Sequence, residues 1–325
     1  MMRGRNRKLL CVGLSLALGL STPTPIWAQA ARDWVTGLPR QAVHVPVWPG
    51  RKKVAVCFVL YVEVWGHGHG PNFRSDMAGR DPDVVDEGFR QYGIIWGVPR
   101  VGQLFHDEGV PLSIALNAQF PAQHPDVWKR FRALVPNASI IAHGMNNSTE
   151  LLPLGQGPDA QKVYIRRTLA MIKQDTGVQS TGWSSPSVYP NGDTFTATAE
   201  AGITYTLDGM DSDTLSRLIT RAGPLLMIPY PAVTVDMGQY LSRNKDPQDL
   251  EHFWIDYVTD LAREAAADPT RDASVVAIGL HPFVVGTPAG AAALRRVIET
   301  LKKQDLVWIT NTEAVVHAVE AVPAQ

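Results

Sequence analysis

Two short apolar runs in this sequence each end abruptly in a histidine. One run, residues 138–142, ends at His143 and is followed by glycine and small polar side chains, and the other, residues 275–280, ends at His281. A buried strand that ends in this way delivers a polar side chain to the carboxyl edge of a parallel sheet, where ligands and catalytic groups gather. Because the two histidines are 138 residues apart in the sequence, they can meet only if both strands belong to one sheet.

Further apolar runs alternate with helical segments along the chain. Residues 54–62 are continuously apolar, as expected for a parallel strand that is buried on both faces. Residues 158–175 have the spacing of an amphipathic helix, and Asp246-Pro247 has the residue types that start one. Seven or eight short strands that alternate with helices predict a parallel α/β domain and favour a barrel.

The first 30 residues have the pattern of a cleavable secretory signal. Basic residues as far as Lys8 precede an apolar run over residues 9–20, and Ala28-Gln29-Ala30 supplies an A-x-A cleavage site. The apolar run is shorter than the roughly 20 residues that a membrane span needs. We therefore expect an exported protein, periplasmic or secreted, without a membrane anchor.

Removal of this segment changes the charge balance. Four of the 30 basic residues lie within residues 1–30, which leaves 26 against 31 acidic residues and a formal net charge of −5. No basic stripe is present, which argues against nucleic acid as a partner. Only Cys57 remains of the two cysteines, so an internal disulfide is excluded. We expect residues 31–50 to form an extended lead-in and residues 51–320 a single barrel domain.

Polar residues at the ends of parallel strands share one rim of the sheet. Glu63 follows the first predicted strand, and Asp208 follows the fifth. With His143 and His281 they form a plausible acid–base site. The other rim residues that we expect to contact a substrate are Trp65, Asn147, Trp183, Ser185 and Tyr230.

Several segments, in order from about residue 54 to 315, resemble the polysaccharide deacetylase superfamily (NodB homology, carbohydrate esterase family 4). They include Tyr61-Val62-Glu63, Asp86-Glu87-Gly88, Gly97-Val98-Pro99-Arg100, Ala142-His143-Gly144, Gly182-Trp183-Ser184-Ser185-Pro186 and Leu280-His281-Pro282. Within the superfamily, the chain resembles the allantoinase-like and cyclic-imidase-like branch. The resemblance implies a distorted (β/α)7 barrel that hydrolyses a non-peptide C–N bond, in a protein that forms homo-oligomers.

The sequence departs from the metal-dependent deacetylases at the positions that would bind metal. Those enzymes have two adjacent aspartates after the first strand and two histidines four residues apart, where this chain has Val62-Glu63 and, at the second histidine position, Asn147. An amide is a poor zinc ligand, so we expect no required metal. If zinc binds, Glu63 and His143 would be its ligands.

Hydrolysis of an amide needs a base that activates water, donors that stabilise the oxyanion, and an acid for the leaving nitrogen. We expect Glu63 to be the base. The resemblance implies that His281 is the general acid, while His143 would bind and polarise water or substrate.

The remaining candidates would bind substrate. Asn147 and Ser185 could donate hydrogen bonds to the carbonyl group. Trp65 and Trp183 could stack on a ring or belong to the core. Asp208 could orient a histidine or contact substrate nitrogen, although a loop-capping role explains it equally well.

Three functions stay open at this point. The first is hydrolysis of a small linear or cyclic amide, and the second is metal-dependent de-N-acetylation of cell-wall or chitin-type glycan. The third is a non-catalytic binding protein on the same barrel.

Val233 and Val235 stand where related sequences tend to have glutamate and asparagine, which indicates a different substrate. His67 and His69, in a glycine-rich loop, are more typical of adventitious metal binding than of a true site.

Overall fold

The computed structural model describes residues 36–73, 84–148 and 150–321. The predicted signal segment and its cleavage site lie outside these residues, and all the elements below belong to the unit formed by residues 31–325. No helix in the described ranges is long and apolar enough to cross a membrane.

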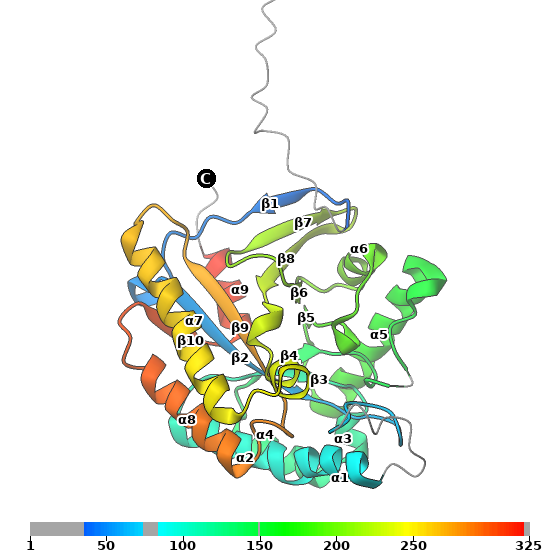
Figure 1. The fold of residues 1–325 in the computed structure, drawn as a ribbon. Coiled ribbons are helices and arrows are strands. Elements are labelled where there is room, and N and C mark those ends of the chain that lie inside the picture. Colours follow the sequence, from blue (N-terminus) through cyan, green and yellow to red (C-terminus); the bar gives the residue numbers. More distant parts are fainter. Residues whose placement is uncertain (1–35, 74–83, 149, 322–325) are drawn as a thin grey trace, which may run out of the picture. The chain divides into compact units, whose positions relative to one another are not determined.

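A large, mostly parallel sheet organises the described residues, with helices packed against it (Figure 1). Its strands are β1 (Arg40–Ala42), β2 (Val54–Val62), β3 (Ser113–Leu116), β4 (Ser139–Ala142), β5 (Gly182–Trp183), β6 (Tyr205–Gly209), β7 (Ser216–Thr220), β8 (Gly223–Pro229), β9 (Ser274–Leu280) and β10 (Val307–Thr310). The strand order is β1-β7-β8-β6-β5-β4-β3-β2-β10, and β9 pairs with β2. Only the β1–β7 and β7–β8 pairs are antiparallel.

The predicted α/β class with a parallel sheet is confirmed, but a closed barrel is not. Within the described residues, no backbone ladder joins β8 to β9. Instead, the short helix η7 (Ala232–Thr234) follows β8, and the Thr234 hydroxyl donates to the carbonyl oxygen of Ala277 in β9 at 2.8 Å. Side-chain contacts thus connect two strands that share no ladder.

The lead-in is part of the sheet. Residues 40–42 form β1 and pair with β7, and Trp48 is buried with its indole N–H donating to the carbonyl oxygen of Ser274 at 2.9 Å. The segment that the sequence predicted as an extended lead-in thus pairs with the sheet at residues 40–42, and Val43, Val45 and Trp48 beyond them are buried.

Helices cover the outer face of the sheet and close its amino end. They are α1 (Val84–Tyr92), α2 (Val98–Glu108), α3 (Phe120–Gln123), α4 (Pro125–Leu134), α5 (Gly157–Thr176), α6 (Gly192–Glu200), α7 (Pro247–Ala267), α8 (Pro288–Leu301) and α9 (Thr312–Glu320). As the sequence predicted, Asp246 caps α7, accepting from the backbone N–H groups of its first turn.

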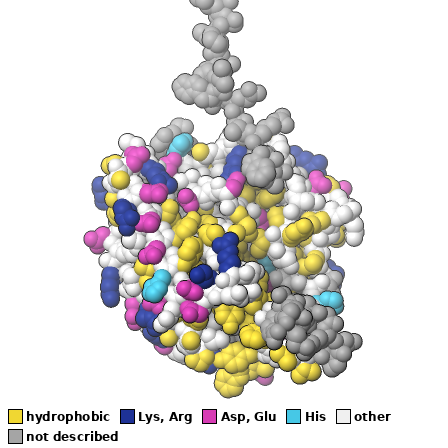
Figure 2. Space-filling model, viewed as in Figure 1, with side chains coloured by type: hydrophobic (Ala, Val, Ile, Leu, Met, Phe, Trp, Pro, Cys, Tyr) yellow, Lys and Arg dark blue, Asp and Glu magenta, His cyan; other side chains and the backbone are white. Residues whose placement is uncertain are grey.

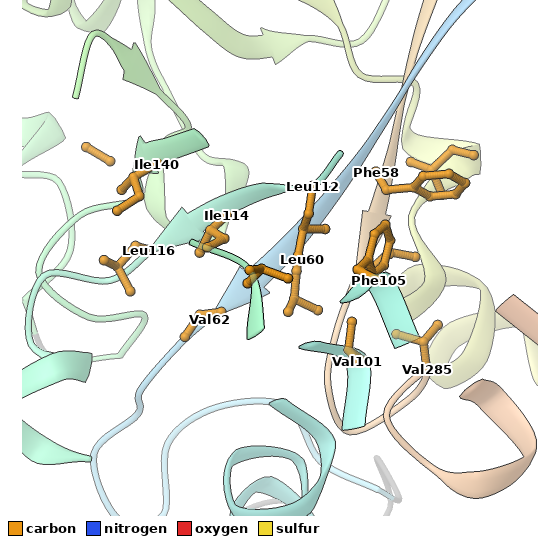
Figure 3. Close-up of a cluster of buried hydrophobic side chains, with 14 of the residues drawn as sticks. Phe58, Leu60, Val62, Val101, Phe105, Leu112, Ile114, Leu116, Ile140 and Val285 are labelled. Carbon is orange, nitrogen blue, oxygen red and sulfur yellow. The ribbon is translucent and has the colours of Figure 1, made fainter. Parts of the chain in front are cut away.

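Alternation along the strands separates two cores. In β2 the even-numbered residues, such as Phe58 and Leu60, contact α2 and its neighbours on the outer face (Figure 3). The odd-numbered residues, such as Val59 and Tyr61, belong to a second cluster on the inner face, which α9 also joins. Because successive side chains point to opposite faces of a sheet, the parity of a residue decides which core it enters.

Gly182 in β5 lies so close to Tyr205 that a side chain cannot be added. A Cβ atom at this position would stand 2.3 Å from the ring of Tyr205, which is fully buried and hydrogen-bonded to Thr312. We expect Gly182→Ala to lower the free energy of unfolding by about 1–3 kcal/mol, as measured by urea denaturation. Gly155→Ala is the matched control, because a Cβ there meets no atom within 4 Å. An equal effect of both changes would contradict this explanation.

Candidate active site

Register and alternation bring the three predicted catalytic residues together. Val62 of β2 is level with Leu116 of β3, which is in turn level with Ala142 of β4. Glu63 follows β2 and His143 follows β4, so these two residues lie at the same level of the sheet. On the other side of β2, Leu60 is level with Leu280, which places His281 beside Tyr61. All three candidates have the parity of the inner face.

These residues line a cavity of about 230 Å³ at the carboxyl ends of the strands, which we call the strand-end cavity. Both polar and apolar residues line this cavity. The polar residues are Tyr61, Glu63, His143, Asn147, Tyr230 and His281, and the larger apolar residues are Trp65, Pro71, Val188, Val235 and Met237. The side chains of Glu63, His143 and His281 are almost wholly buried, with at most 4% of each residue exposed. Charges on these groups therefore interact with little screening by water.

A proton is shared between Glu63 and His143. The Nδ1 atom of His143 lies 2.9 Å from the carbonyl oxygen of Ser184, which can only accept, so Nδ1 carries a hydrogen. The Nε2 atom lies 3.1 Å from Oε1 of Glu63. This contact needs one proton, which makes the pair either imidazolium and carboxylate or neutral imidazole and carboxylic acid.

Asn147 donates its side-chain N–H to the same Oε1 atom of Glu63. Its own backbone N–H donates to the carbonyl oxygen of Val64 at 3.1 Å, which fixes the residue beside β2. One N–H of the amide group is thus used by Glu63, and Asn147 also lines the strand-end cavity. The Oδ1 atom is buried and has no hydrogen-bond partner among the described residues.

His281 is held by Asp236, a residue that was not among the predicted site residues. The Nδ1 atom of His281 lies 2.6 Å from one carboxylate oxygen of Asp236, and the backbone N–H of His281 donates to the other at 2.7 Å. Nothing in the sequence near Asp236 signals this pairing, because 45 residues separate the two and the segment around Asp236 is irregular. The Nε2 atom of His281 is left facing Glu63, 3.8 Å from its Oε2 atom.

The surroundings of His281 favour its protonated form. Burial lowers the pKa of His281, but the charge of Asp236, its hydrogen bond and the charge of Glu63 together raise the pKa above 6.5. The interaction therefore stabilises the fold fully below pH 6.5, and this contribution is lost as the pH rises through the folded-state pKa. A protonated histidine with a free Nε2–H is suited to act as a general acid near neutral pH.

Tyr61 packs between the two histidines, and Tyr230 packs on Tyr61. The ring of Tyr61 stacks on His281, with centroids 5.0 Å apart and planes at 8°, and meets His143 edge-on at 4.9 Å, while its ring centroid is 5.8 Å from that of Tyr230. Burial raises the pKa of Tyr61 and that of Tyr230 well above their usual range. Both remain neutral phenols at physiological pH, and Tyr61 fixes the orientation of the two imidazole rings.

Three predicted binding residues lie away from the cavity. Trp183 is fully buried in the outer core, and its indole N–H donates to the Ser185 hydroxyl at 3.0 Å. The backbone N–H and hydroxyl of Ser185 both donate to Asp208, at 2.8 and 2.7 Å. Of the two roles left open for Trp183, the structure places it in the core, and Ser185 lies outside the cavity lining and supports the loop after β5. Asp208, whose pKa is raised by burial, supports the same loop.

Trp65 and Tyr230 lie where the sequence placed them, on the cavity wall. His67 and His69 are exposed outside the cavity, and His67 is 4.0 Å from Glu87. A larger cleft of about 420 Å³ lies at the amino ends of β3 and β4, but its lining has no carboxylate. Acid–base chemistry is therefore concentrated in the strand-end cavity.

The residues at the position of the superfamily's metal do not fit zinc. Glu63 Oε1 is already hydrogen-bonded to two nitrogens, and Asn147 turns its nitrogen, which cannot bind a metal, toward the carboxyl group. The orphaned Oδ1 atom of Asn147 is an amide oxygen, a donor better suited to harder cations. In the described ranges, no group of three histidine, cysteine, aspartate or glutamate side chains could hold a metal ion. We derive no step through a metal.

On the face shown in Figure 2, basic and acidic side chains are interspersed, and no broad area of a single sign is visible. The residues that line the strand-end cavity include no lysine or arginine among those described. Neither feature is typical of a site that binds a polyanion.

Comparisons with known proteins agree with the resemblance found in the sequence. No protein-family model matches the chain, and no curated protein is similar enough to match it. Among solved structures, one described as a polysaccharide deacetylase from Mycobacterium smegmatis is 24% identical, with a TM-score of 0.71, and covers 86% of this chain and 95% of its own. Another, from Pseudomonas aeruginosa PAO1, is 24% identical, with a TM-score of 0.74 and coverage of 87% and 96%.

A third similar structure is a PuuE allantoinase, which is 26% identical, with a TM-score of 0.73 and coverage of 87% of this chain and 95% of its own. The predicted resemblance to the polysaccharide deacetylase superfamily and its allantoinase-like branch is thereby confirmed. The likeness extends over nearly the full length of these structures.

Proposed function

We propose that this protein is a hydrolase that cleaves the C–N bond of a small linear or cyclic amide. The observation that carries this proposal is the position of Glu63 between two buried histidines in the strand-end cavity, one of them held by Asp236. The similar structures support the reaction class, because their names are those of deacetylases and an allantoinase.

Glu63 is assigned as the general base. His143 and Asn147 both donate to Oε1, and no hydrogen bond to Oε2 is found among the described residues. Of the two forms of the His143–Glu63 pair, we propose that the imidazolium and carboxylate form reacts, because in it Glu63 is a carboxylate with Oε2 available. In the proposed reaction Oε2 takes a proton from water while the water oxygen attacks the carbonyl carbon.

His281 is assigned as the general acid. Its Nε2–H donates a proton to the leaving nitrogen as the C–N bond breaks, and Asp236 holds Nδ1 so that Nε2 faces the reacting atoms. The products are a carboxylic acid and the released nitrogen group, which is an amine from a simple amide, an amide from an imide and a urea from a hydantoin. The two stay joined in one molecule when the substrate is a ring. The proton on Glu63 and the one lost by His281 then re-equilibrate with solvent.

Hydrolysis of a panel of amides tests the proposal. Purified protein would be incubated with succinimide, glutarimide, hydantoin and chitin oligomers, with and without a strong zinc chelator. We expect turnover of at least one cyclic amide at a rate that the chelator leaves unchanged, because the donor set does not fit zinc. Release of acetate from chitin oligomers alone, or activity only with added zinc, would favour the de-N-acetylase instead. Binding without any turnover would favour a non-catalytic protein.

Export is part of the proposal. The basic, apolar and A-x-A segments of residues 1–30 support a periplasmic or secreted location for this activity.

A further inference from the structure

We propose that the apolar wall of the strand-end cavity selects an uncharged substrate with an apolar substituent, and that Val235 is a specificity-determining residue in that wall. This inference rests on the proposed hydrolysis of a small amide. It concerns the half of the substrate that does not react.

The lining of the cavity contains both polar and apolar groups. The catalytic candidates Glu63, His143 and His281 are polar, whereas Val188, Val235 and Met237 contribute apolar side chains, which together we call the apolar wall. A substituent that contacts these three residues gains affinity by losing apolar surface to water. A carboxylate or phosphate there would be desolvated without a partner, since none of the described lining residues is lysine or arginine.

The strained backbone at Val188 indicates that the apolar lining of the cavity has a functional role. Ser187 and Val188 follow β5 with φ angles of 57° and 48°, in the left-handed region. For a β-branched residue such as Val188 this conformation is rare and costly, and such strain is concentrated at functional sites. Both residues line the cavity, and Val188 packs in the inner cluster that also includes Val235. The fold thus holds an apolar side chain at the cavity in spite of an unfavourable backbone.

The structure shows which of two nearby valines lines the cavity, a distinction that the sequence does not provide. Val233 and Val235 are two residues apart and of the same type, but only Val235 lines the cavity. Val233 lies in η7 and turns its backbone carbonyl to the side chain of Gln239, at 2.7 Å. Substitution at Val233 should therefore leave substrate choice unchanged, which makes it a matched control for Val235.

The experiment compares succinimide, 3-methylsuccinimide and 3-carboxysuccinimide on the full protein and two variants. For the unmodified protein we expect kcat/KM for the methyl compound to exceed that for succinimide about tenfold, since one buried methyl group discriminates by roughly this factor. The carboxylate compound should be the poorest. In Val235→Thr, which keeps the size of valine but replaces one methyl group with a hydroxyl, the methyl advantage should fall to about twofold or less. In Val233→Thr it should persist.

Dissociation constants for the same compounds, measured by titration calorimetry, separate this inference from the proposed function. If no compound is hydrolysed but the methyl compound still binds best and loses its advantage only in Val235→Thr, the proposed function is wrong and the inference holds. The inference is overturned if Val235→Thr keeps the preference, if Val233→Thr loses it equally, or if none of the compounds binds.

Discussion

Replacing Glu63 with glutamine is expected to lower kcat for amide hydrolysis by about 10²- to 10⁴-fold, the usual contribution of a general base. Glutamine has nearly the same size and keeps one oxygen that can accept from His143 and Asn147, as Oε1 does now. It cannot take a proton from water. Because the base acts in the transition state, KM should change far less than kcat, which steady-state kinetics would show directly.

Asp208→Asn provides the control for this change. Asp208 lies near the carboxyl end of β6 and is half-buried, but it receives hydrogen bonds from Ser185 and does not line the cavity. If loss of any buried carboxylate disturbs the fold, both variants should lose activity together. A Glu63→Gln enzyme that keeps more than about one tenth of the original kcat would exclude Glu63 as the base.

The catalytic candidates could be predicted because strand ends leave a strong local signal. Glu63, His143 and His281 each follow a continuous apolar run, and polar side chains at such ends gather on one edge of a parallel sheet. The same rule also selected Trp183 and Ser185, which face the opposite side. Strand ends show where the sheet stops, but the alternation of inner and outer faces is needed to show which side chain enters the cavity.

Other features of the fold and of the site could not be predicted from the local sequence pattern. Strand β7 contains only two apolar residues, Leu218 and Ile219, so its antiparallel pairing with β8 and β1 has no clear periodic signal. Asp236 lies between two short irregular helical turns, and only the tertiary structure brings it to His281. Long-range contacts of irregular segments depend on the assembled fold and not on nearby residues.

Replacing Asp236 with asparagine is expected to lower kcat by about 10²- to 10⁴-fold and to change its pH dependence. Asparagine can still accept one hydrogen bond from His281, but it carries no charge. The pKa of His281 is raised above 6.5 because Asp236 and Glu63 outweigh burial. Without Asp236, burial gains relative weight and the pKa falls. A general acid must be protonated, so the alkaline limb of the kcat profile should move to lower pH.

The direction in which the alkaline limb moves distinguishes two roles of Asp236. In one, its charge raises the pKa of His281; in the other, it only holds the backbone in place. If Asp236 only held the backbone of His281, to which it is bonded at 2.7 Å, the variant would lose activity equally at every pH. Nuclear magnetic resonance titration of the His281 ring would then give an unchanged pKa. Asp213→Asn is the control, because Asp213 is bonded to Tyr257 and lies outside the cavity lining. If the acid limb of the profile moved to lower pH in Asp236→Asn and the alkaline limb stayed in place, the assignment of His281 as the acid would be contradicted, since the active form would then be the neutral imidazole.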